Sequence, residues 1–201
     1  MNKKEILAYL KEAGLSPNKA YGQHFLISQK YIEAIVTAIS PQPDDCILEI
    51  GPGPGILTAP LSRLVKKLIC VEIDAGFARI LAEQFAAMTQ VTIVHDDFLK
   101  VAPVDECTRI VGNLPYNVSS QIIFRVAKHY TALQCFFLIQ KEMAARLIAL
   151  PGSAMYSAFT VGVQLYFDVH KLFDIPPHAF YPAPKVHSTF VKLIRKKDIP
   201  L

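Results

Sequence analysis

The sequence lacks the patterns that mark membrane-spanning, secreted and zinc-binding proteins. It has no apolar run approaching about 18 residues and no apolar segment behind its N-terminal lysines, so we expect neither a membrane-spanning helix nor a signal peptide. Its histidines never fall at i, i+4 with a nearby Glu or Cys, and its cysteines form no C-x-x-C pair, so no zinc pattern emerges. We therefore expect a cytoplasmic protein with no bound metal and no membrane association.

The cysteines are also too widely spaced to indicate a disulfide framework. Cys46, Cys70 and Cys135 lie within apolar runs, where cysteine behaves as a small buried hydrophobic residue. The charged fraction of 19% is too low for disorder, and the hydrophobic fraction of 52% suits a globular protein. We expect residues 1–201 to form one domain with a sizeable core, and we expect a monomer. The net charge of +4 is compatible with a polyanionic partner but does not require one.

The hydrophobic pattern predicts strands that alternate with helices. Helices are predicted at residues 2–13, 29–40, 56–66, 75–88, 119–130 and 141–149, and strands at 46–50, 68–73, 91–94, 110–112, 134–139, 160–168 and 187–194. Such alternation indicates an α/β protein with a parallel sheet and helices on both faces. The last two strands are joined by the Pro-rich loop 175–186 without a crossover helix, which implies antiparallel pairing at one edge. This pattern resembles the Rossmann-like class I methyltransferase fold, with a mostly parallel seven-stranded sheet and one antiparallel edge strand.

The first strand–loop–helix unit has the features of a nucleotide site. Gly51, Gly53 and Gly55 allow the backbone to turn sharply and to approach a ligand closely. About twenty residues further on, Glu72 ends the second strand, where its carboxylate can accept hydrogen bonds from ribose hydroxyls. Position 56 is Ile, so G-x-G-x-x-G is absent, and G-x-G-x-G fits S-adenosylmethionine better than NAD(P) or a purely structural turn. Asp97 closes the third strand and could accept a hydrogen bond from the amino group of an adenine; a solvated turn is the alternative.

A second candidate site follows the strand at residues 110–112. It presents a carboxamide, a backbone carbonyl next to a rigid proline and an aromatic ring, from the residues Asn113, Leu114, Pro115 and Tyr116. Asn113 can accept a hydrogen bond from an amino group, and Tyr116 can stack on a flat base; a flipped nucleobase needs both contacts. The four residues resemble the signature of enzymes that methylate the exocyclic nitrogen of adenine. A simple turn closing a strand is the structural alternative.

These motifs occur in one order with several others. They are Gly22–Leu26, Glu49–Gly55, Glu72, Asp97, Asn113–Ser119, Gln140–Glu142 and Pro176–Val186. Together, from about residue 17 to residue 195, they resemble the KsgA (RsmA) family of rRNA adenine dimethyltransferases. The family dimethylates two adjacent adenines near the 3′ end of small-subunit (16S) rRNA, so the resemblance implies an RNA-binding enzyme of ribosome biogenesis whose partner is the small subunit.

The resemblance also implies roles for individual residues. It places S-adenosylmethionine against His24, Leu26, Gly51, Glu72, Asp97 and Asn113. It makes Asn113, Leu114 and Tyr116 the reactive edge, and it makes Phe180 the second aromatic that covers the other face of the target base. Residues 1–28 would supply an N-terminal helix and a segment that contacts the cofactor.

Three departures from the family pattern stand out. Ser28 replaces the usual Asp, which affects a local hydrogen bond but not the cofactor site. Ser157-Ala158 replaces the common Gly-Arg, so one basic RNA contact is expected to be missing. Family members usually continue with a small basic helical domain, whereas this sequence stops at Leu201. Two alternatives stay open: an Erm-type methyltransferase of large-subunit rRNA, or a mainly non-catalytic ribosome-assembly or RNA-binding factor.

Overall fold

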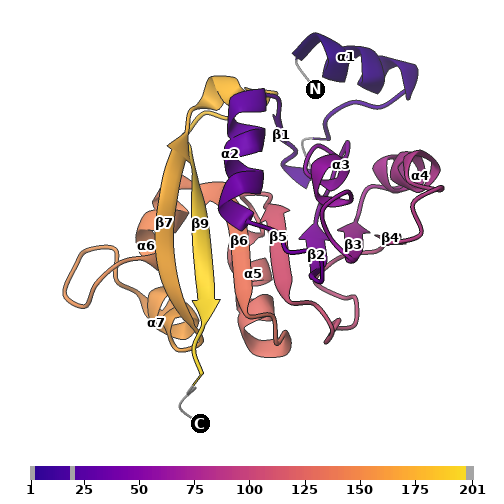
Figure 1. Cartoon of the computed structure of the whole chain (residues 1–201). Coiled ribbons are helices and arrows are strands. Elements are labelled where there is room, and N and C mark those ends of the chain that lie inside the picture. The colour runs from indigo at the N-terminus through magenta and orange to yellow at the C-terminus, as the bar shows by residue number, and fades with distance from the viewer. Residues whose placement is uncertain (1–2, 19–20, 198–201) are drawn as a thin grey trace.

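The computed structural model describes residues 3–18 and 21–197 (Figure 1). The helices are α1 (Lys3–Glu12), α2 (Gln29–Ile39), α3 (Thr58–Leu61), α4 (Ala75–Gln84), α5 (Ser119–His129), α6 (Lys141–Leu147) and α7 (Ala158–Gln164), with a 3-10 turn η2 (Pro177–Ala179). The strands are β1 (Phe25–Leu26), β2 (Cys46–Ile50), β3 (Lys67–Glu72), β4 (Val91–His95), β5 (Arg109–Asn113), β6 (Gln134–Gln140), β7 (Phe167–Ile175), β8 (Phe180–Tyr181) and β9 (Ser188–Arg195).

A seven-stranded sheet with the order β4-β3-β2-β5-β6-β9-β7 forms the centre of the protein. β4, β3, β2, β5 and β6 pair in parallel, which confirms the α/β fold class. β9 pairs antiparallel with both β6 and β7, so the antiparallel strand lies one position in from the edge and β7 forms the edge itself. The strand order reverses between β2 and β5, and ligands of open α/β sheets bind at such a switch point.

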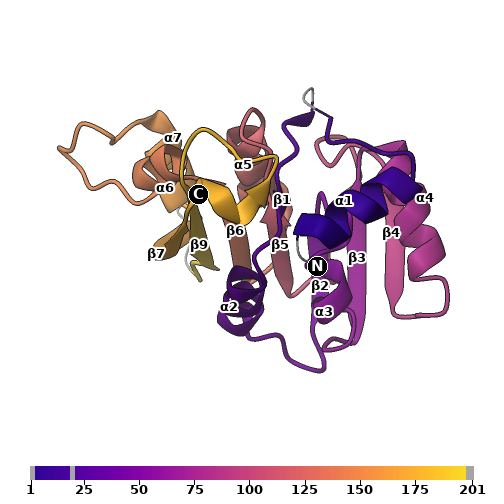
Figure 2. The ribbon, with the colours of Figure 1, turned by 90° about the horizontal axis from the view of Figure 1, so that it is seen from above.

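Helices cover both faces of this sheet, as the view from above shows (Figure 2). α2 and α3 pack on one face, where buried residues such as Ile35, Leu61 and Phe136 form one hydrophobic cluster. α5, α6 and α7 pack on the other face, where Ile123 and Phe137 belong to a second cluster. All five residues of β2 are buried because helices cover both faces of the sheet; four of them are apolar, and Glu49 is the exception. Cys46, Cys70 and Cys135 are buried and free, as their apolar surroundings predicted, and Cys107 is buried and free as well.

The N-terminal segment lies over the carboxyl ends of the strands (Figure 1). Ile6 and Leu10 of α1 are buried against Phe25 and against Phe77 of α4. β1 then pairs antiparallel with β8, which joins this segment to the Pro-rich loop in a separate two-stranded sheet that the sequence did not predict. In the described part of the chain, no helix has both the length and the apolar character needed to cross a membrane.

The predicted strand at residues 160–168 is wrong over most of its length. Residues 158–164 form α7, and β7 begins only at Phe167. The buried residues of α7 are Phe159, Thr160 and Val163, whose spacing places them on one helical face. Several predicted helices are also too long: α3 has only four residues, α4 ends at Gln84, and residue 2 of the first predicted helix lies outside the described residues.

Candidate active site

Most of the residues predicted for the site converge at the carboxyl edge of the sheet. β2, β5 and β3 end there in Ile50, Asn113 and Glu72, and the loops that follow surround a cavity, here called the central pocket. It is lined by Tyr21, Gly22, Gln23, His24, Phe25, Gly51, Gly53, Glu72, Ile73, Asn113, Leu114, Pro115 and Tyr116. The pocket therefore brings His24, Gly51, Glu72, Asn113, Leu114 and Tyr116 together, as the sequence predicted.

Gly51 and Glu72 give one wall of the central pocket the character of a nucleotide site. Gly51 has φ +63°, and a Cβ atom at this position would meet no other atom within 4 Å, so the glycine leaves open space beside the loop. The Glu72 carboxylate is 3% exposed and accepts hydrogen bonds from Gly53 N at 2.8 Å and Asp74 N at 2.9 Å. Burial raises the pKa of Glu72, although these two N–H groups oppose that change. Each oxygen keeps a lone pair that can accept a ligand hydroxyl.

A second cavity, the Asp97 pocket, adjoins the central pocket. Both cavities share Tyr21, Gly51, Ile73 and Pro115. The remaining lining of the Asp97 pocket is mainly apolar and comes from Ile50, Val71, Asp96, Asp97, Phe98, Leu99, Asn117, Val118 and Ile122. Asp97 Oδ1 accepts a hydrogen bond from Leu99 N at 2.9 Å, which fixes the carboxylate at the mouth of an apolar slot. Such a slot, with an acceptor at its edge, suits a flat ring that carries an amino group.

Close packing of β5 on β2 sets the position of Asn113. A Cβ atom at Gly112 would lie 2.9 Å from Ile50 O and 2.8 Å from a Leu114 side-chain atom, so only glycine fits between these neighbours. Asn113 Nδ2 donates a hydrogen bond to His24 O at 2.7 Å, which leaves Oδ1 as the group that can accept from a ligand. Leu114 N donates to Leu138 O at 3.0 Å, which anchors the following peptide.

Other side chains hold Tyr116 at its hydroxyl group and at one face of its ring. Its hydroxyl and Ser188 Oγ of β9 form a hydrogen bond of 2.7 Å, and Ser188 itself is fully buried. The His24 ring stacks on the Tyr116 ring, with centroids 5.6 Å apart and planes at 26°. His24 Nδ1 lies 2.7 Å from Pro182 O, and since a carbonyl oxygen only accepts, Nδ1 carries the proton. The aromatic ring of the motif therefore has a fixed plane before any base arrives.

A third cavity, the Tyr181 pocket, shares Gly22, Gln23, His24 and Tyr116 with the central pocket. It is lined by Pro17, Gly22, Gln23, His24, Tyr116, Gln140, Tyr181, Pro182, Ala183, Pro184 and Lys185. Phe180 is not among these residues. It is 3% exposed and packs in the hydrophobic cluster on the α2 face of the sheet, together with Leu26. The cause is the pairing of β8 with β1, because successive residues of a strand point to opposite faces.

Leu26, like Phe180, does not line the pocket in which a role was expected for it. Its side chain is buried in that cluster and lines a narrow cavity next to the central pocket, which also contacts Glu49, Gly51 and Asn113. Tyr21 and Tyr181 line these cavities although no role was predicted for either of them, and Pro182, expected only to stiffen its loop, lines the Tyr181 pocket. The period of two in a strand could have indicated that Phe180 and Tyr181 face opposite ways. Within the described residues, no group of three or more His, Cys, Asp or Glu could hold a metal ion.

Comparison with known proteins agrees with this geometry. A family model described as ribosomal RNA adenine dimethylase matches residues 14–200. The ribosomal RNA small subunit methyltransferase A of Xylella fastidiosa is 40% identical over 183 residues, which cover 88% of this chain and 69% of that protein.

Two solved structures are also similar. A dimethyladenosine transferase from Plasmodium falciparum has a TM-score of 0.80 and 31% identity, over 86% of this chain but only 64% of that one. The 23S rRNA methyltransferase ErmE has a TM-score of 0.76 and 28% identity, over 88% of this chain and 72% of that one. Both have the class I methyltransferase fold that this sheet order shows. The match to the family model covers most of the sequence, and the chain belongs to the ribosomal RNA adenine dimethylase family.

Proposed function

We propose that this protein transfers methyl groups from S-adenosylmethionine to the N6 atoms of two adjacent adenines near the 3′ end of small-subunit rRNA. The observation that carries the proposal is the fixed amide of Asn113 at the wall of the central pocket, where the Asp97 pocket and the Tyr181 pocket both adjoin it. Family membership and the name of the Xylella fastidiosa relative support the choice of rRNA.

The residues present fit S-adenosylmethionine. Gly51 leaves open space beside the loop, Glu72 offers two carboxylate oxygens in a buried wall, and Asp97 lies at the edge of an apolar slot. His24 and Asn113 would complete the contacts from the other side, while Leu26 would act from the neighbouring cavity. When bound, this cofactor supplies a methyl group on a positively charged sulfur, which makes the methyl carbon open to attack by an amine.

The chain's own contribution is to prepare the amino group of adenine. The lone pair of N6 is delocalised into the ring, so this nitrogen is a poor nucleophile. Asn113 Oδ1 and the Leu114 carbonyl can accept hydrogen bonds from its two N–H groups, which would draw the nitrogen towards tetrahedral geometry and stabilise the positive charge that develops there. Once the methyl group is on N6, one of these protons passes to solvent water. Fixed acceptors need no reorganisation during the reaction, and alignment of the reacting atoms contributes up to about 7–11 kcal/mol in ideal cases. No strong base is required.

The target adenine must leave its stack to reach Asn113. The Tyr116 ring, whose plane is set by Ser188 and His24, offers a surface for this base. Stacking on an aromatic side chain contributes about 1–3 kcal/mol, enough to offset the unstacking of a loop base. Phe180 can cover the other face only if it leaves the hydrophobic cluster in which it is 3% exposed.

The test is transfer of labelled methyl groups to unmethylated small and large ribosomal subunits, followed by mapping of the labelled bases. We expect label on two adjacent adenines near the 3′ end of the small-subunit rRNA. Label on large-subunit rRNA would instead support the Erm-type activity, which the similarity to ErmE keeps as the second candidate. Binding of S-adenosylmethionine without transfer to either subunit would favour a non-catalytic RNA-binding role, and absence of cofactor binding would refute the methyltransferase function.

A further inference from the structure

His24 contacts three segments that are far apart in the sequence. Its backbone carbonyl accepts a hydrogen bond from Asn113 Nδ2 at 2.7 Å, and its ring atom Nδ1 lies 2.7 Å from Pro182 O. The same ring stacks on Tyr116 at a centroid distance of 5.6 Å. His24 also lines both the central pocket and the Tyr181 pocket. His24 therefore connects Asn113, Tyr116 and Pro182.

The carbonyl of His24 decides which end of the Asn113 amide faces a substrate. An asparagine side chain can present either its oxygen or its nitrogen, and an incoming amino group needs the oxygen. A carbonyl oxygen accepts hydrogen bonds and donates none, so the His24 carbonyl binds Nδ2 and excludes Oδ1 from the same place. A flipped amide would bring two oxygens together and present a donor to a donor. The position of this carbonyl therefore controls whether Asn113 can act as an acceptor.

The ring of His24 holds that carbonyl in place. Pro182 O can only accept, so the Nδ1–H group donates to it and ties residue 24 to the loop after β8. Ile27 N donates to Ala179 O at 2.8 Å, and β1 pairs with β8, so this stretch is fixed on its other side as well. The segment before His24 is closed on itself by an Asn18 N to Gln23 Oε1 bond of 2.7 Å, and a longer bond of 3.4 Å from Gln23 Nε2 to Asp74 Oδ2 connects it to the start of α4. Loss of the bond to Pro182 would therefore free the backbone on the side of Asn113.

We propose that His24 is a positioning residue for methyl transfer, which acts through its bond to Pro182 to hold the Asn113 amide with Oδ1 towards the adenine. The proposal rests on the proposed function of the site. Contacts of Oδ1 with the amino group strengthen as that nitrogen becomes tetrahedral, so loosening them lowers kcat more than it raises the KM for the subunit.

Two substitutions separate the hydrogen bond from the ring. Asn in place of His24 keeps a nitrogen donor at the same number of bonds from the backbone and removes the ring. Phe keeps a flat ring next to Tyr116 and removes the donor. We expect His24→Phe to lower kcat about tenfold or more, because the loosened Asn113 amide would weaken its own hydrogen bond to the reacting amino group, and we expect His24→Asn to recover several-fold of that loss. His129→Phe and His129→Asn, at the exposed end of α5, are the matched controls and should keep full activity.

The measurements are kcat and KM for methyl transfer to unmethylated small subunits, the Kd for S-adenosylmethionine by calorimetry, and NMR of the Asn113 side-chain amide. In His24→Phe the protons on Nδ2 should exchange faster with water, while His24→Asn should keep the wild-type rate. Equal kcat values in His24→Phe and the wild type, or an unchanged Asn113 amide, would overturn the inference. So would a loss confined to the Kd, since His24 would then be only a cofactor contact. An inactive wild type would refute the proposed function, whereas the NMR experiment would still decide whether His24 orients Asn113.

Discussion

Asn113 shows how one side chain can be both anchored and available. Its nitrogen is bound to the His24 carbonyl at 2.7 Å, and its oxygen makes no hydrogen bond with the residues that the structure describes. An unpaired acceptor at the wall of a pocket is prepared for a ligand, because its partner need not be displaced first. The anchor also removes the rotational freedom that would otherwise be lost when the substrate binds.

Replacing Asn113 with Ala should therefore abolish most of the transfer and leave cofactor binding measurable. Removing one fixed group that stabilises developing charge typically lowers kcat about 100- to 1000-fold. Single-turnover transfer to small subunits and calorimetry with S-adenosylmethionine would measure the two effects separately. Gln121→Ala, on the exposed side of α5, is the control. Near-normal transfer by Asn113→Ala would show that another group accepts the amino protons.

Glu49 is a buried carboxyl next to the same loop. It is 2% exposed, accepts a hydrogen bond from Thr58 Oγ1 at 2.7 Å, and lies 3.7 Å from the Cys70 thiol sulfur. Burial raises the pKa of Glu49 to about 7, although the bonds from Thr58 and Cys70 oppose this. The folded protein therefore keeps the Glu49 proton up to a pH at which the unfolded chain has already lost it.

This difference makes stability depend on pH in a defined direction. Between the ordinary value of 4.5 and about 7, the unfolded state binds fewer protons at Glu49, so the free energy of unfolding falls as the pH rises. Glu49→Gln lacks this titration, so it should gain stability relative to the wild type by about 3 kcal/mol between pH 4.5 and pH 8. Urea denaturation across this range would measure it, with the exposed Glu83→Gln as control. A difference that does not change with pH would contradict the assigned cause.

The sequence could predict Gly51, Glu72 and Asn113 because each of them ends or follows a strand with a clear apolar run. In a parallel sheet the carboxyl ends of neighbouring strands meet, so their convergence follows from the topology. The place of Phe180 could not be predicted in this way. It depends on the register Leu26↔Phe180 between two strands of two residues each, whose pairing no local pattern specifies.

At the scale of elements, α7 shows a conflict between local propensity and packing. The residues 159–163 include a Phe, a Thr and two Val, which favour strands. Ser157 N instead donates to Thr160 Oγ1 at 3.1 Å, and Thr160 Oγ1 donates to Arg146 O at 2.8 Å, which joins the start of α7 to α6. The capping box formed by Ser157 and Thr160 favours the helix locally, and the tertiary contacts with α6 and α5 favour it as well. The Ser157-Ala158 pair that departs from the family pattern forms the start of this helix.

Thr160→Val tests the importance of this junction. Valine has almost the same shape but no hydroxyl, so Ser157 N and Arg146 O would both lose their partner in a buried place. We expect a loss of about 1–3 kcal/mol in the free energy of unfolding. Thr37→Val, on the exposed side of α2, should change it by less than about 0.5 kcal/mol. Equal urea midpoints for Thr160→Val and Thr37→Val would show that the hydroxyl does not hold α7 on α6.

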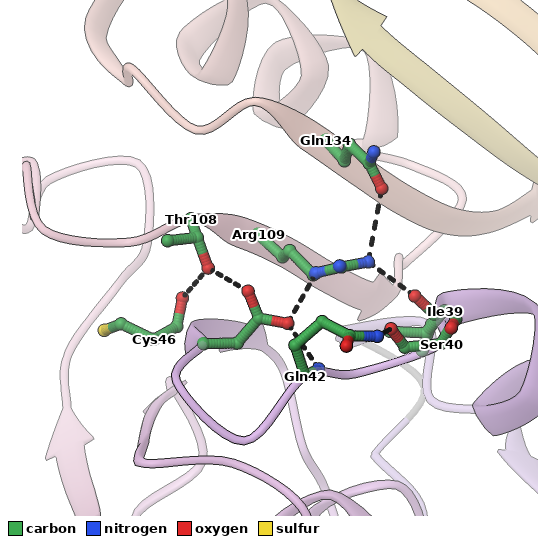
Figure 3. A network of polar contacts seen from close by, with 8 residues as sticks. Ile39, Ser40, Gln42, Cys46, Thr108, Arg109 and Gln134 are labelled. Atoms are coloured by element: carbon green, nitrogen blue, oxygen red, sulfur yellow. Dashed lines mark hydrogen bonds and ion pairs between the residues drawn. The ribbon is translucent and has the colours of Figure 1, made fainter.

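At the scale of the whole molecule, the two ends of the parallel strands have different functions. The carboxyl edge, where the parallel strands end, carries the three pockets, and the amino edge, where they begin, carries a network of partly buried polar contacts (Figure 3). Arg109 Nε pairs with Asp45 Oδ2 at 2.7 Å, and the same guanidinium donates to Ile39 O of α2 and to Gln134 Oε1 of β6. Asp45 also accepts from Thr108 Oγ1 and Gln42 N, both at 2.7 Å. This network joins the end of α2 to the first residues of β5 and β6.

Because the network and the pockets lie at opposite ends of the strands, we expect that weakening the network lowers stability without lowering the affinity for the cofactor. Asp45→Asn removes the charge that pairs with Arg109, while both side chains are mostly buried at 10% and 14% exposure. A buried charge left without its partner costs about 3 kcal/mol or more, and we expect the lower end because some exposure remains. The Kd for S-adenosylmethionine should stay within about threefold of the wild type, because the pockets lie at the other ends of the strands.

Urea denaturation and calorimetry on the same preparations would measure both quantities. Glu106→Gln is the matched control, because its ion pair with Lys67 also lies at the amino edge but is exposed, at 55% and 41%. Exposed pairs contribute little to folding, so this variant should unfold at the same urea concentration as the wild type. If Asp45→Asn were as stable as Glu106→Gln, the network would not hold α2 on the sheet. If Asp45→Asn lost cofactor affinity at a temperature where it remains folded, the amino edge would have to be coupled to the site through the strands themselves.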